Sequence, residues 1–397
     1  MTTTSAIYWD PFDEVIDESP HAIWRRMRDE VPLYRNDTFD FWALSRHADV
    51  HAAHVDPQTY LSGYGTVLEL MGTDMSGTGQ IIFMDGQQHT KMRVLVSKAF
   101  TRGRVAALED RIRQFCTELL DAQAGSGGFD YVADFGAQLP SLVISSLLDV
   151  SPADRPRVLE LINTTFHIEP GVGMMNEVSF NAQIELHGYV TDQLADRRKA
   201  PRDDLITALT EAELTDDGTV RRLTDKEAAD FAVLLISAGT ETVAKLLGWA
   251  SVILADHPDQ RAAMADDPSL VPAAVEELLR YEAPSPVQGR VLSRPVELYG
   301  ETLPKGVKVL LLTGSAGRDD RVWDRPDEFD IKRKPEQHVA FGIGAHFCLG
   351  AALARMEGRI ALEETLARFP AWQVDTANVV RLHTSTVRGY KSVPILV

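Results

Sequence analysis

Cysteine is scarce in this chain, which has only Cys116 and Cys348 among 397 residues. Two cysteines cannot build a disulfide framework, and their scarcity fits a reducing compartment. Cys116 falls in a helical apolar stripe with Ile112, Phe115 and Leu119, which predicts a core residue. Basic residues are outnumbered, 40 against 58 acidic ones, and the net charge of −18 argues against wholesale binding to nucleic acid or to an anionic membrane.

Long apolar runs and targeting signals are also missing. No segment offers about 18 uncharged apolar residues, and residues 1–20 have neither a basic start nor an apolar core. We therefore expect no membrane span, no signal peptide and a cytoplasmic protein. No repeat, linker or change in composition divides the chain, which predicts a single domain over 1–397 with a loosely structured arm at about 1–15.

Helical periodicity dominates what is present. It predicts helices at roughly 20–30, 47–55, 88–98, 104–124, 138–148, 152–166, 177–198, 203–212, 225–256, 258–266, 271–281 and 351–368. Strand patterns are short and fall at Phe41–Leu44, Val287–Leu292, Val296–Leu298, Val307–Leu312 and the tail after His383. The fold class is mainly α with small β-sheets.

Two long segments lack periodicity. Leu61 to Asp85 is rich in glycine and methionine, and 166–180 contains Gly171, Gly173 and two further methionines. Irregular segments of this length in a compact protein are usually functional or mobile, and methionines suit the wall of an apolar pocket. Ordinary loops with core filling are the equal alternative, and whether these segments lie open or closed stays undetermined.

The other cysteine, Cys348, lies in F-G-I-G-A-H-F-C-L-G, directly before an apolar-periodic run that starts at Ala351. A cysteine at a helix start faces unpaired N–H groups and the positive end of the helix dipole, which favour the thiolate. Such a thiolate can ligate a metal or attack an electrophile. Gly344 and Gly350 allow tight turns and close approach of the backbone to a flat partner.

The pattern F-x-x-G-x-H-x-C-x-G strongly resembles the haem-ligand loop of the cytochrome P-450 superfamily. The resemblance runs from about Pro20 to the end of the chain, with the motifs in the family's order. It implies that Cys348 ligates the iron of haem b, that Gly350 borders the cofactor, and that a long central helix lies over the haem.

The predicted helix 225–256 opens with a capping box at Thr224–Glu227 and has a weak middle, Ala238-Gly239-Thr240-Glu241-Thr242. Glycine in a helix interior costs about 1 kcal/mol relative to alanine, so this cluster needs a reason. Small residues would let a flat ligand approach, and a hydroxyl beside a carboxylate, both freed from the helix ladder, could pass protons inward. The alternative is helix packing, with Glu241 paired to Lys245 at i, i+4.

The same five residues match A-G-x-[DE]-T, the oxygen-activation motif of the superfamily. By this resemblance Thr242 handles dioxygen through its hydroxyl, Glu241 serves proton delivery, and Ala238 and Gly239 border the haem. The resemblance also identifies Glu277-x-x-Arg280 with the family's E-x-x-R and Arg333 with its third partner. The implied role of that trio is a buried network that steadies the ligand loop.

Two haem carboxylates require cationic or donor partners. By resemblance these are His89 and Arg93 on one helical face, Arg290 on a strand, and His346 two residues before the cysteine. For His89 and Arg93 the alternative is an ordinary solvated face.

Three histidines, His47, His51 and His54, share one predicted helical face and could hold zinc or copper. No H-E-x-x-H pattern accompanies them. A partly exposed helix with ordinary histidines is the stronger interpretation, and a zinc hydrolase is a distant alternative.

A basic segment stands out from the acidic background. It holds Lys98, Arg102, Arg104, Arg111 and Arg113, with Arg355 and Arg359 just past the cysteine. A basic face on the proximal side of the haem would steer an acidic ferredoxin-type electron donor. A solvated helix face is the equal alternative.

The resemblance implies a monooxygenase that uses dioxygen and electrons ultimately from NAD(P)H through partner proteins. We expect a monomer that inserts oxygen into a C–H or double bond of a terpenoid, steroid, fatty-acid derivative or polyketide. Its pocket should be lined by residues 61–85, 166–180, Leu234 to Ala238, Val287 to Leu292 and Thr384 to Val387. A peroxide-driven haem oxygenase and a non-catalytic haem-binding protein remain the alternatives.

Overall fold

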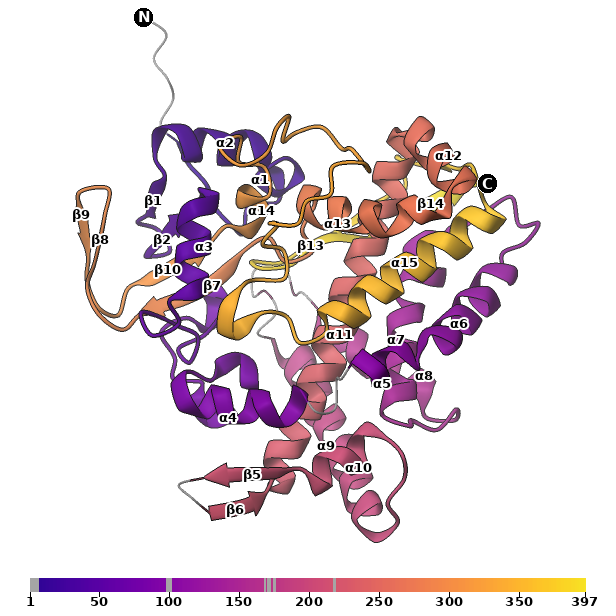
Figure 1. Ribbon diagram of the computed structural model, residues 1–397, viewed down its shortest axis with the longest axis horizontal. Coiled ribbons are helices and arrows are strands. Elements are labelled where there is room, and N and C mark those ends of the chain that lie inside the picture. Colours follow the sequence, from indigo (N-terminus) through magenta and orange to yellow (C-terminus); the bar gives the residue numbers. More distant parts are fainter. Residues whose placement is uncertain (1–6, 98–101, 168, 170–172, 174–175, 217–218) are drawn as a thin grey trace, which may run out of the picture.

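The computed structural model of the protein describes residues 7–97, 102–167, 169, 173, 176–216 and 219–397. Its helices are α1 (Glu14–Glu18), α2 (His21–Glu30), α3 (His47–Val55), α4 (Gly86–Ser97), α5 (Arg102–Ala106), α6 (Glu109–Asp121), α7 (Gln138–Leu147), α8 (Arg155–Thr165), α9 (Glu177–Lys199), α10 (Leu205–Glu211), α11 (Asp225–Asp256), α12 (Pro258–Asp266), α13 (Val271–Tyr281), α14 (Thr313–Ala316) and α15 (Ala351–Arg368). A π-helical turn, η4, spans Tyr131–Gly136. The mainly helical fold expected from periodicity is confirmed (Figure 1).

The strands are short and lie in five small sheets. Their bounds are β1 (Leu33–Asn36), β2 (Phe41–Leu44), β3 (Tyr60–Leu61), β4 (Gly128–Asp130), β5 (Glu213–Asp216), β6 (Thr219–Arg222), β7 (Gln288–Leu292), β8 (Val296–Leu298), β9 (Glu301–Leu303), β10 (Lys308–Leu311), β11 (Gln373–Val374), β12 (Val380–His383), β13 (Arg388–Ser392) and β14 (Pro394–Leu396). The largest sheet has the order β1-β2-β10-β7-β3. In it Arg290 of β7 pairs with Val309 of the antiparallel β10, which fixes where the Arg290 side chain points.

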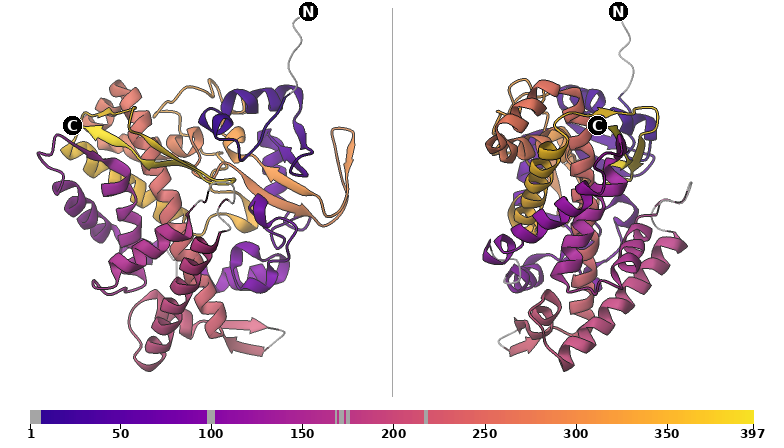
Figure 2. Two further views of the ribbon diagram at one scale, coloured as in Figure 1. Left: turned by 180° about the vertical axis from the view of Figure 1, so that it is seen from behind. Right: turned by 90° about the vertical axis from the view of Figure 1, so that its right-hand side faces the viewer.

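Helix α11 passes through the middle of the molecule (Figures 1 and 2). The predicted capping box is confirmed, because Thr224 Oγ1 accepts from the Glu227 N–H and Glu227 Oε2 accepts from the Thr224 N–H. The first half of α11, up to Ile236, packs in a core formed with α8, α9 and α10. The second half, from Val243, packs in a separate core with α6, α7, α13 and α15. The weak middle of the helix therefore lies between two cores.

Helix α11 is also the one helix among the described residues that is long and apolar enough to cross a membrane. Of its most apolar window, 61% is buried inside the protein. The same apolarity is what a central core helix requires.

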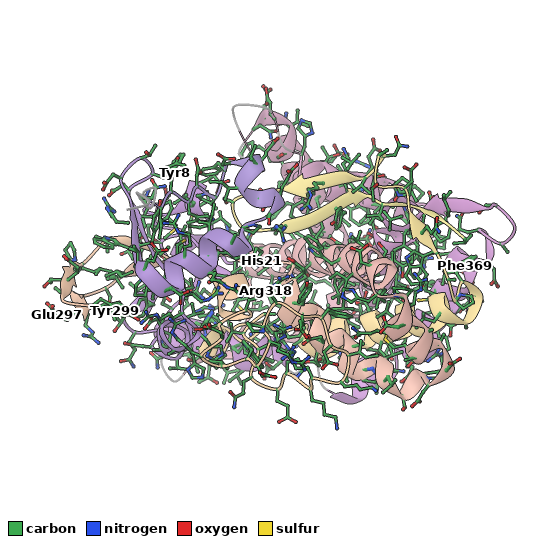
Figure 3. All side chains as sticks on the ribbon, turned by 90° about the horizontal axis from the view of Figure 1, so that it is seen from above. Tyr8, His21, Glu297, Tyr299, Arg318 and Phe369 are labelled. Atoms are coloured by element: carbon green, nitrogen blue, oxygen red, sulfur yellow. The ribbon has the colours of Figure 1, made fainter. Side chains whose placement is uncertain are left out.

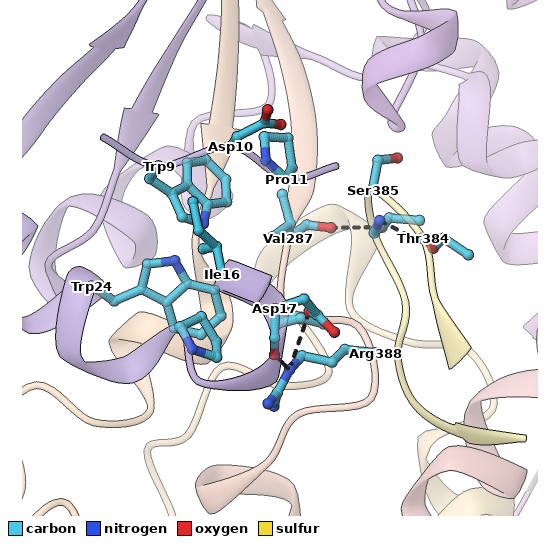
Figure 4. Close-up of a pocket in the computed structure, with 13 residues that line it drawn as sticks. Trp9, Asp10, Pro11, Ile16, Asp17, Trp24, Val287, Thr384, Ser385 and Arg388 are labelled. Atoms are coloured by element: carbon cyan, nitrogen blue, oxygen red, sulfur yellow. Dashed lines mark hydrogen bonds and ion pairs between the residues drawn. The ribbon is translucent and has the colours of Figure 1, made fainter. Parts of the chain in front are cut away.

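The N-terminal segment packs onto the largest sheet from Ile7 onward, while residues 1–6 lie outside the described part. Trp9 is 2% exposed and its N–H donates to the Tyr34 hydroxyl at 2.9 Å. A small pocket of about 20 Å³ lies between Trp9, Trp24 and Arg388. Arg388 donates a hydrogen bond to the backbone oxygen of Asp17 and forms an ion pair with its carboxylate (Figure 4). This packing ties α1 and α2 to β13.

A buried carboxylate, Glu282, joins the same elements at the end of α13. Its oxygens accept from His21, Arg318 and Arg388. Burial opposes the charge of Glu282, but these three partners hold the pKa of its carboxyl well below the usual range. Figure 3 shows His21 and Arg318 together near the centre, and Glu297 and Tyr299 at the outlying β8–β9 hairpin.

One local prediction was wrong, and several elements were not predicted. The expected helix 104–124 is divided, because the Leu108 N–H bonds to Val105 O in a turn between α5 and α6. The β5–β6 hairpin was missed, since its strands carry mostly charged and polar residues without apolar alternation. The short helix α1 was also missed, although Asp13 caps it by accepting from the Val15 and Ile16 N–H groups.

Candidate active site

A cavity of about 410 Å³ lies between the middle of α11 and the loop before α15. Cys348 lines one side of it, and Ala238, Gly239 and Thr242 of α11 line another. The tertiary structure thus brings together two motifs that are about a hundred residues apart in the sequence.

The loop before α15 presents Cys348 through tight turns. Gly342 and Gly344 have φ values of +66° and +74°, a conformation that glycine adopts without strain. The Cys348 N–H donates to Phe341 O at 2.9 Å, which closes the loop. Gly350 has a φ of −85°, so its backbone does not require glycine, and a Cβ built there would meet no atom within 4 Å. The absence of a side chain leaves space beside the cavity.

The thiol of Cys348 behaves differently from the expectation based on the helix dipole. Burial raises the pKa of this thiol, although the Gly350 N–H, Arg93 and Arg355 all lower it. Loss of hydration therefore outweighs the helix terminus in the protein alone. A metal cation bound to the sulfur supplies the missing charge and deprotonates a coordinating thiol.

Four basic side chains line the same cavity, namely His89, Arg93, Arg290 and His346. The rings of His89 and His346 lie 4.1 Å apart between centroids. Burial and the neighbouring Arg290 lower the pKa of His346 to about 2. Arg290 is 5% exposed, and burial lowers the pKa of its guanidinium to about 10.

These basic groups lack matching negative charge. Among the described residues, the one carboxylate near them is Asp85, whose oxygen lies 4.0 Å from His346 Nε2. Arg290 donates to the backbone oxygen of Gly289 at 2.6 Å and forms no ion pair within that part of the chain. A buried guanidinium without a counter-ion is unfavourable, so this edge of the cavity fits a ligand with carboxylates. The two carboxylates of haem would meet that requirement, and Cys348 would be the residue that ligates its iron.

The middle of α11 stays helical, contrary to the expectation that its polar groups leave the helix ladder. The Thr242 hydroxyl donates to Ala238 O at 3.0 Å, so it satisfies the helix backbone while its lone pairs remain free. A side chain on Gly239 would meet Ile144 Cδ1 at 2.8 Å. Gly239 therefore also serves the helix packing that the sequence offered as an alternative.

Glu241 forms the ion pair that the packing alternative predicted. Its Oε1 lies 2.8 Å from Lys245 Nζ, and the two side chains are 13% and 6% exposed. Neither residue lines the cavity, whereas Thr242 does. The Glu241 carboxylate therefore lies next to a residue of the cavity wall but does not itself face the cavity.

The predicted trio behind the ligand loop is assembled. Arg280 donates through Nε and Nη2 to both oxygens of Glu277 at 2.7 Å, and Arg333 Nε donates to Glu277 Oε1 at 3.0 Å. The side chains of Glu277 and Arg280 are fully buried. Arg280 also donates to Gly317 O and Pro326 O, so the network holds the chain that leads into the loop.

The three histidines of α3 do not converge on one point. His47 Nε2 pairs with Gln337 O, and the His47 and His51 rings lie 6.1 Å apart between centroids. His54 is 5% exposed, and its two ring nitrogens have no hydrogen-bond partner in the described part of the chain. Burial lowers its pKa to about 3. Ala48, His51 and Ala52 of the same helix are exposed, so the predicted partly exposed helix is confirmed. In the described part of the chain, no His, Cys, Asp and Glu side chains gather as a metal site of three or more.

Part of the basic segment is neutralised. Arg113 pairs with Glu363 and Glu364, and Arg359 pairs with Glu109 and Glu363. The hydrogen bond to Glu363 is the largest influence on the Arg113 guanidinium, and together with Glu364 it raises the pKa above the usual value although burial lowers it. Lys98 and the side chain of Arg102 lie outside the described residues. The prediction of a basic face used only the cations of one segment. It did not include the acidic residues of α15, which only the tertiary structure places against them.

Two further carboxylates near the cysteine were not predicted. Glu276 accepts from Arg355 at 2.6 Å and contacts His338 at 2.9 Å, which links α13 to both ends of the loop. Glu357 lines the cavity and is 1% exposed, and burial raises its pKa to about 8. A glutamate on the apolar face of the predicted helix 351–368 was the available signal for Glu357.

The expected cavity wall is found in part. Four of the five predicted segments contribute, for example through Thr66, Leu234, Gln288 and Val387. No described residue of 166–180 lines the cavity, and residues 168, 170–172, 174 and 175 lie outside the described part. Ile144 of α7, Phe231 and Ser285 line it without having been predicted.

A family profile described as cytochrome P450 matches residues 29–385. The chain is 42% identical over 391 residues to "Putative cytochrome P450 123" of Mycobacterium tuberculosis, covering 98% of this chain and 96% of that protein. It is 36% identical over 402 residues to "Vitamin D(3) 25-hydroxylase" of Pseudonocardia autotrophica, with 100% and 98% covered. The solved structure of cytochrome P450 CYP109Q5 from Chondromyces apiculatus superposes with a TM-score of 0.87 at 35% identity, covering 97% and 96%.

Both the profile and the relatives span nearly all of this chain, so the family extends over the cavity, the cysteine loop and the central helix. Membership implies haem iron, dioxygen, a hydrophobic substrate and redox partner proteins. The chain belongs to the cytochrome P450 family and is a haem-thiolate monooxygenase.

Proposed function

We propose that Cys348 ligates the haem iron and that the enzyme oxidises an apolar small molecule held against the middle of α11. The observation that carries this proposal is one cavity with Cys348 on one side, Thr242 on another, and four basic side chains at its edge that have one carboxylate, Asp85, near them in the described part of the chain. When bound, haem supplies the metal at which dioxygen is reduced, and a thiolate ligand donates electron density that favours O–O cleavage.

In this proposal the basic edge holds the cofactor. His89, Arg93, Arg290 and His346 bind the haem carboxylates, and Gly350 leaves room beside the sulfur. The network of Glu277, Arg280 and Arg333 keeps the ligand loop in place, because it bonds to backbone oxygens before the loop as well as to itself.

The protons come from the other wall. The Thr242 hydroxyl donates its hydrogen bond to Ala238 O, so its lone pairs can accept a hydrogen bond from a donor group in the cavity. That hydrogen bond orients the donor group within the cavity. Glu241, the residue directly before Thr242 in the helix, is the carboxyl that supplies protons from the solvent side. The apolar residues around the cavity exclude bulk water from this exchange.

The substrate is proposed to be largely apolar with a few polar groups. Val67, Ile82, Leu234 and Val387 provide the apolar lining, while Ser285, Gln288 and Thr386 offer hydroxyl and amide groups on one side. A terpenoid, steroid, fatty-acid derivative or polyketide fits such a lining. The relative named as a vitamin D(3) 25-hydroxylase supports a largely apolar substrate.

The remaining expectations are proposals of the same kind. Electrons come from NAD(P)H through a ferredoxin-type donor that docks near Arg104 and Arg111. The chain acts as one domain and as a monomer in the cytoplasm. The neutralised arginines of α6 and α15 leave a weaker basic face than the sequence indicated, which makes docking sensitive to the few exposed cations.

Replacing Cys348 by alanine tests the ligand assignment. The variant Cys348→Ala should lose the long-wavelength Soret band of the reduced carbon monoxide complex, which reports thiolate ligation. Cys116→Ala removes the only other thiol and should keep the band, because Cys116 is a buried core residue. Retention of the band in Cys348→Ala would refute the assignment.

Turnover assays separate the alternatives. Oxidation of a substrate with NAD(P)H, ferredoxin and reductase supports the monooxygenase, while turnover with hydrogen peroxide alone supports a peroxide-driven enzyme. A protein that binds carbon monoxide but forms no oxygen-dependent product is a non-catalytic haem protein. Candidate substrates are found by titrating terpenoids, steroids, fatty acids and macrolides and following the low- to high-spin change in absorbance.

A further inference from the structure

Glu276, His338 and Arg355 form a cluster beside the cysteine loop that the proposed catalytic roles leave unused. Arg355 of α15 donates through Nε and Nη2 to the two oxygens of Glu276 on α13, at 2.6 and 2.9 Å. His338, in the chain before the loop, contacts Glu276 Oε2 at 2.9 Å. The side chains of Glu276, His338 and Arg355 are 26%, 4% and 37% exposed, so the Glu276 cluster reaches from the surface into the protein.

Hydrogen bonds fix the charge of each member of the Glu276 cluster. His338 Nδ1 accepts from the Ala340 N–H at 3.3 Å, so the ring proton is on Nε2 and is donated to Glu276. Burial opposes the charge of Glu276, but the hydrogen bonds with His338 and Arg355 lower the pKa of its carboxyl to about 2. The cluster therefore holds one carboxylate and one guanidinium, with an imidazole that orients the carboxylate.

The guanidinium of this cluster lies against the loop that carries Cys348. It lies over the Phe341 ring, with Arg355 Cζ 4.5 Å from the ring centroid. Phe341 and Cys348 both line the cavity, and the Phe341 backbone oxygen accepts from the Cys348 N–H at 2.9 Å. Arg355 is near enough to act on the sulfur, since it is one of the groups that oppose the effect of burial on the pKa of that thiol. A charge at this position acts on whatever the cysteine binds.

The same pairing makes Arg355 a poor docking cation, although the sequence placed it on a basic face. A cation steers a charged partner through charge that is not already compensated, whereas both oxygens of Glu276 are bonded to this guanidinium. An arginine fixed by a carboxylate on one side and by an aromatic ring on the other is suited to impose a constant field on a neighbouring metal ligand.

We propose that the Glu276 cluster is a positioning set that adjusts the reduction potential of the bound haem iron through the net charge it places beside Cys348. The inference rests on the proposed ligation of the iron by Cys348. When the iron accepts one electron from the redox partner, the iron and its sulfur ligand together become more negative by one charge. Arg355 favours that reduced form and Glu276 opposes it, while His338 fixes the balance by holding the carboxylate on the guanidinium.

Reduction potentials of the holoenzyme test this without a substrate or a redox partner. They are measured by titration with dithionite in the presence of mediator dyes. Arg355→Met removes the favourable charge, so the equilibrium constant for reduction should fall at least about threefold, or about 28 mV for a one-electron couple. Glu276→Gln removes the opposing charge and should shift the potential by a similar factor in the other direction. The double variant removes both charges and should lie near wild type.

Two further variants are the controls. Arg355→Lys keeps the charge without the bidentate pair and should stay close to wild type, and it also shows whether the site tolerates substitution. Arg359→Met, one turn farther along α15, removes an arginine that pairs with Glu109 and Glu363 and should shift the potential less than Arg355→Met. The Soret band of the reduced carbon monoxide complex is recorded for every variant, so that only protein with thiolate ligation is compared. If Arg355→Met binds too little haem, Arg355→Gln replaces it.

The outcomes separate this inference from the ligand assignment. If Cys348→Ala keeps the long-wavelength band, the ligand assignment fails, and this inference fails with it. If the band depends on Cys348 but Arg355→Met and Glu276→Gln shift the potential in the same direction, the cluster only holds the loop in place. A shift smaller than threefold in both variants, or a double variant farther from wild type than either single variant, has the same meaning.

Discussion

The two walls of the cavity beside Cys348 are held by different forces. The cysteine wall is fixed by buried ions, since Arg280 and Arg333 bond both to Glu277 and to several backbone oxygens. The helix wall around Phe231 and Leu234 is apolar, and its polar groups bond within α11 or to one neighbouring strand. Directional hydrogen bonds fix the geometry of a metal ligand. An apolar wall tolerates substitution of its side chains, so it can vary with the substrate.

The largest expected effect is on the cysteine wall. Glu277→Ala leaves two arginines without their carboxylate in the interior, and breaking a buried pair in this way costs about 3–5 kcal/mol. We expect a protein that retains little haem and unfolds at much lower urea concentration. Glu328→Gln is the control, because Glu328 pairs with Arg325 at the surface, where both side chains are more than half exposed. Near-normal stability of Glu277→Ala would show that the network is dispensable.

The lone carboxyl in the cavity, Glu357, should give the protein a pH-dependent stability. Burial raises its pKa from 4.5 to about 8, so the folded state keeps a proton that the unfolded chain releases. The stabilisation is complete below about pH 4.5 and is lost as pH rises through about 8, a change on the order of a few kcal/mol. Unfolding curves of Glu357→Gln across this range should be flatter than those of wild type.

The exposed Glu336 supplies the control for that measurement. Glu336→Gln should leave the pH dependence of unfolding unchanged, because its side chain stays in solvent in both states. Parallel curves for Glu357→Gln and wild type would mean that the buried carboxyl is ionised in the folded protein.

On the helix wall, removing the Thr242 hydroxyl should affect chemistry more than structure. Thr242→Val keeps the shape, and we expect about tenfold less product per NAD(P)H with more peroxide, since a positioned proton-transfer group is lost. Thr240→Val is matched to it, because the Thr240 hydroxyl also donates to a carbonyl one turn back but does not line the cavity. Equal coupling in the two variants would contradict the role of Thr242.

The smallest expected effect concerns Arg290, which lies at the basic edge of the cavity. Arg290→Met removes a buried guanidinium that forms no ion pair with the described residues. We expect haem to transfer to apomyoglobin about tenfold faster, because a charge-assisted hydrogen bond is lost, and the protein without haem to become more stable. Arg294→Met, on the exposed end of the same segment, should change neither property. A variant less stable in both forms would point to packing instead.

The sequence was most informative where function depends on local spacing. The cysteine turn before helix 351–368 and the capping box of helix 225–256 appear in the structure as their spacing predicted, whereas the burial of Glu277 and Arg280 was indicated only by the family resemblance. The sequence was least informative for strands without alternation, such as Glu213–Asp216, and for the cavity wall. Those depend on segments far apart in the chain, whose packing no local pattern records.

The charged and polar groups also show which features follow from sequence spacing and which follow from tertiary packing. The sequence by itself determined that Cys348 sits between glycine turns at the start of a helix, and that Thr242 and Glu241 are neighbours on another. Only the tertiary structure decided that the Lys245 ammonium reaches Tyr390 O, that burial raises the pKa of the Cys348 thiol, and that α15 places Glu363 and Glu364 against Arg113. Backbone periodicity sets which side chains share a face, but hydration and ion pairing depend on what packs against that face.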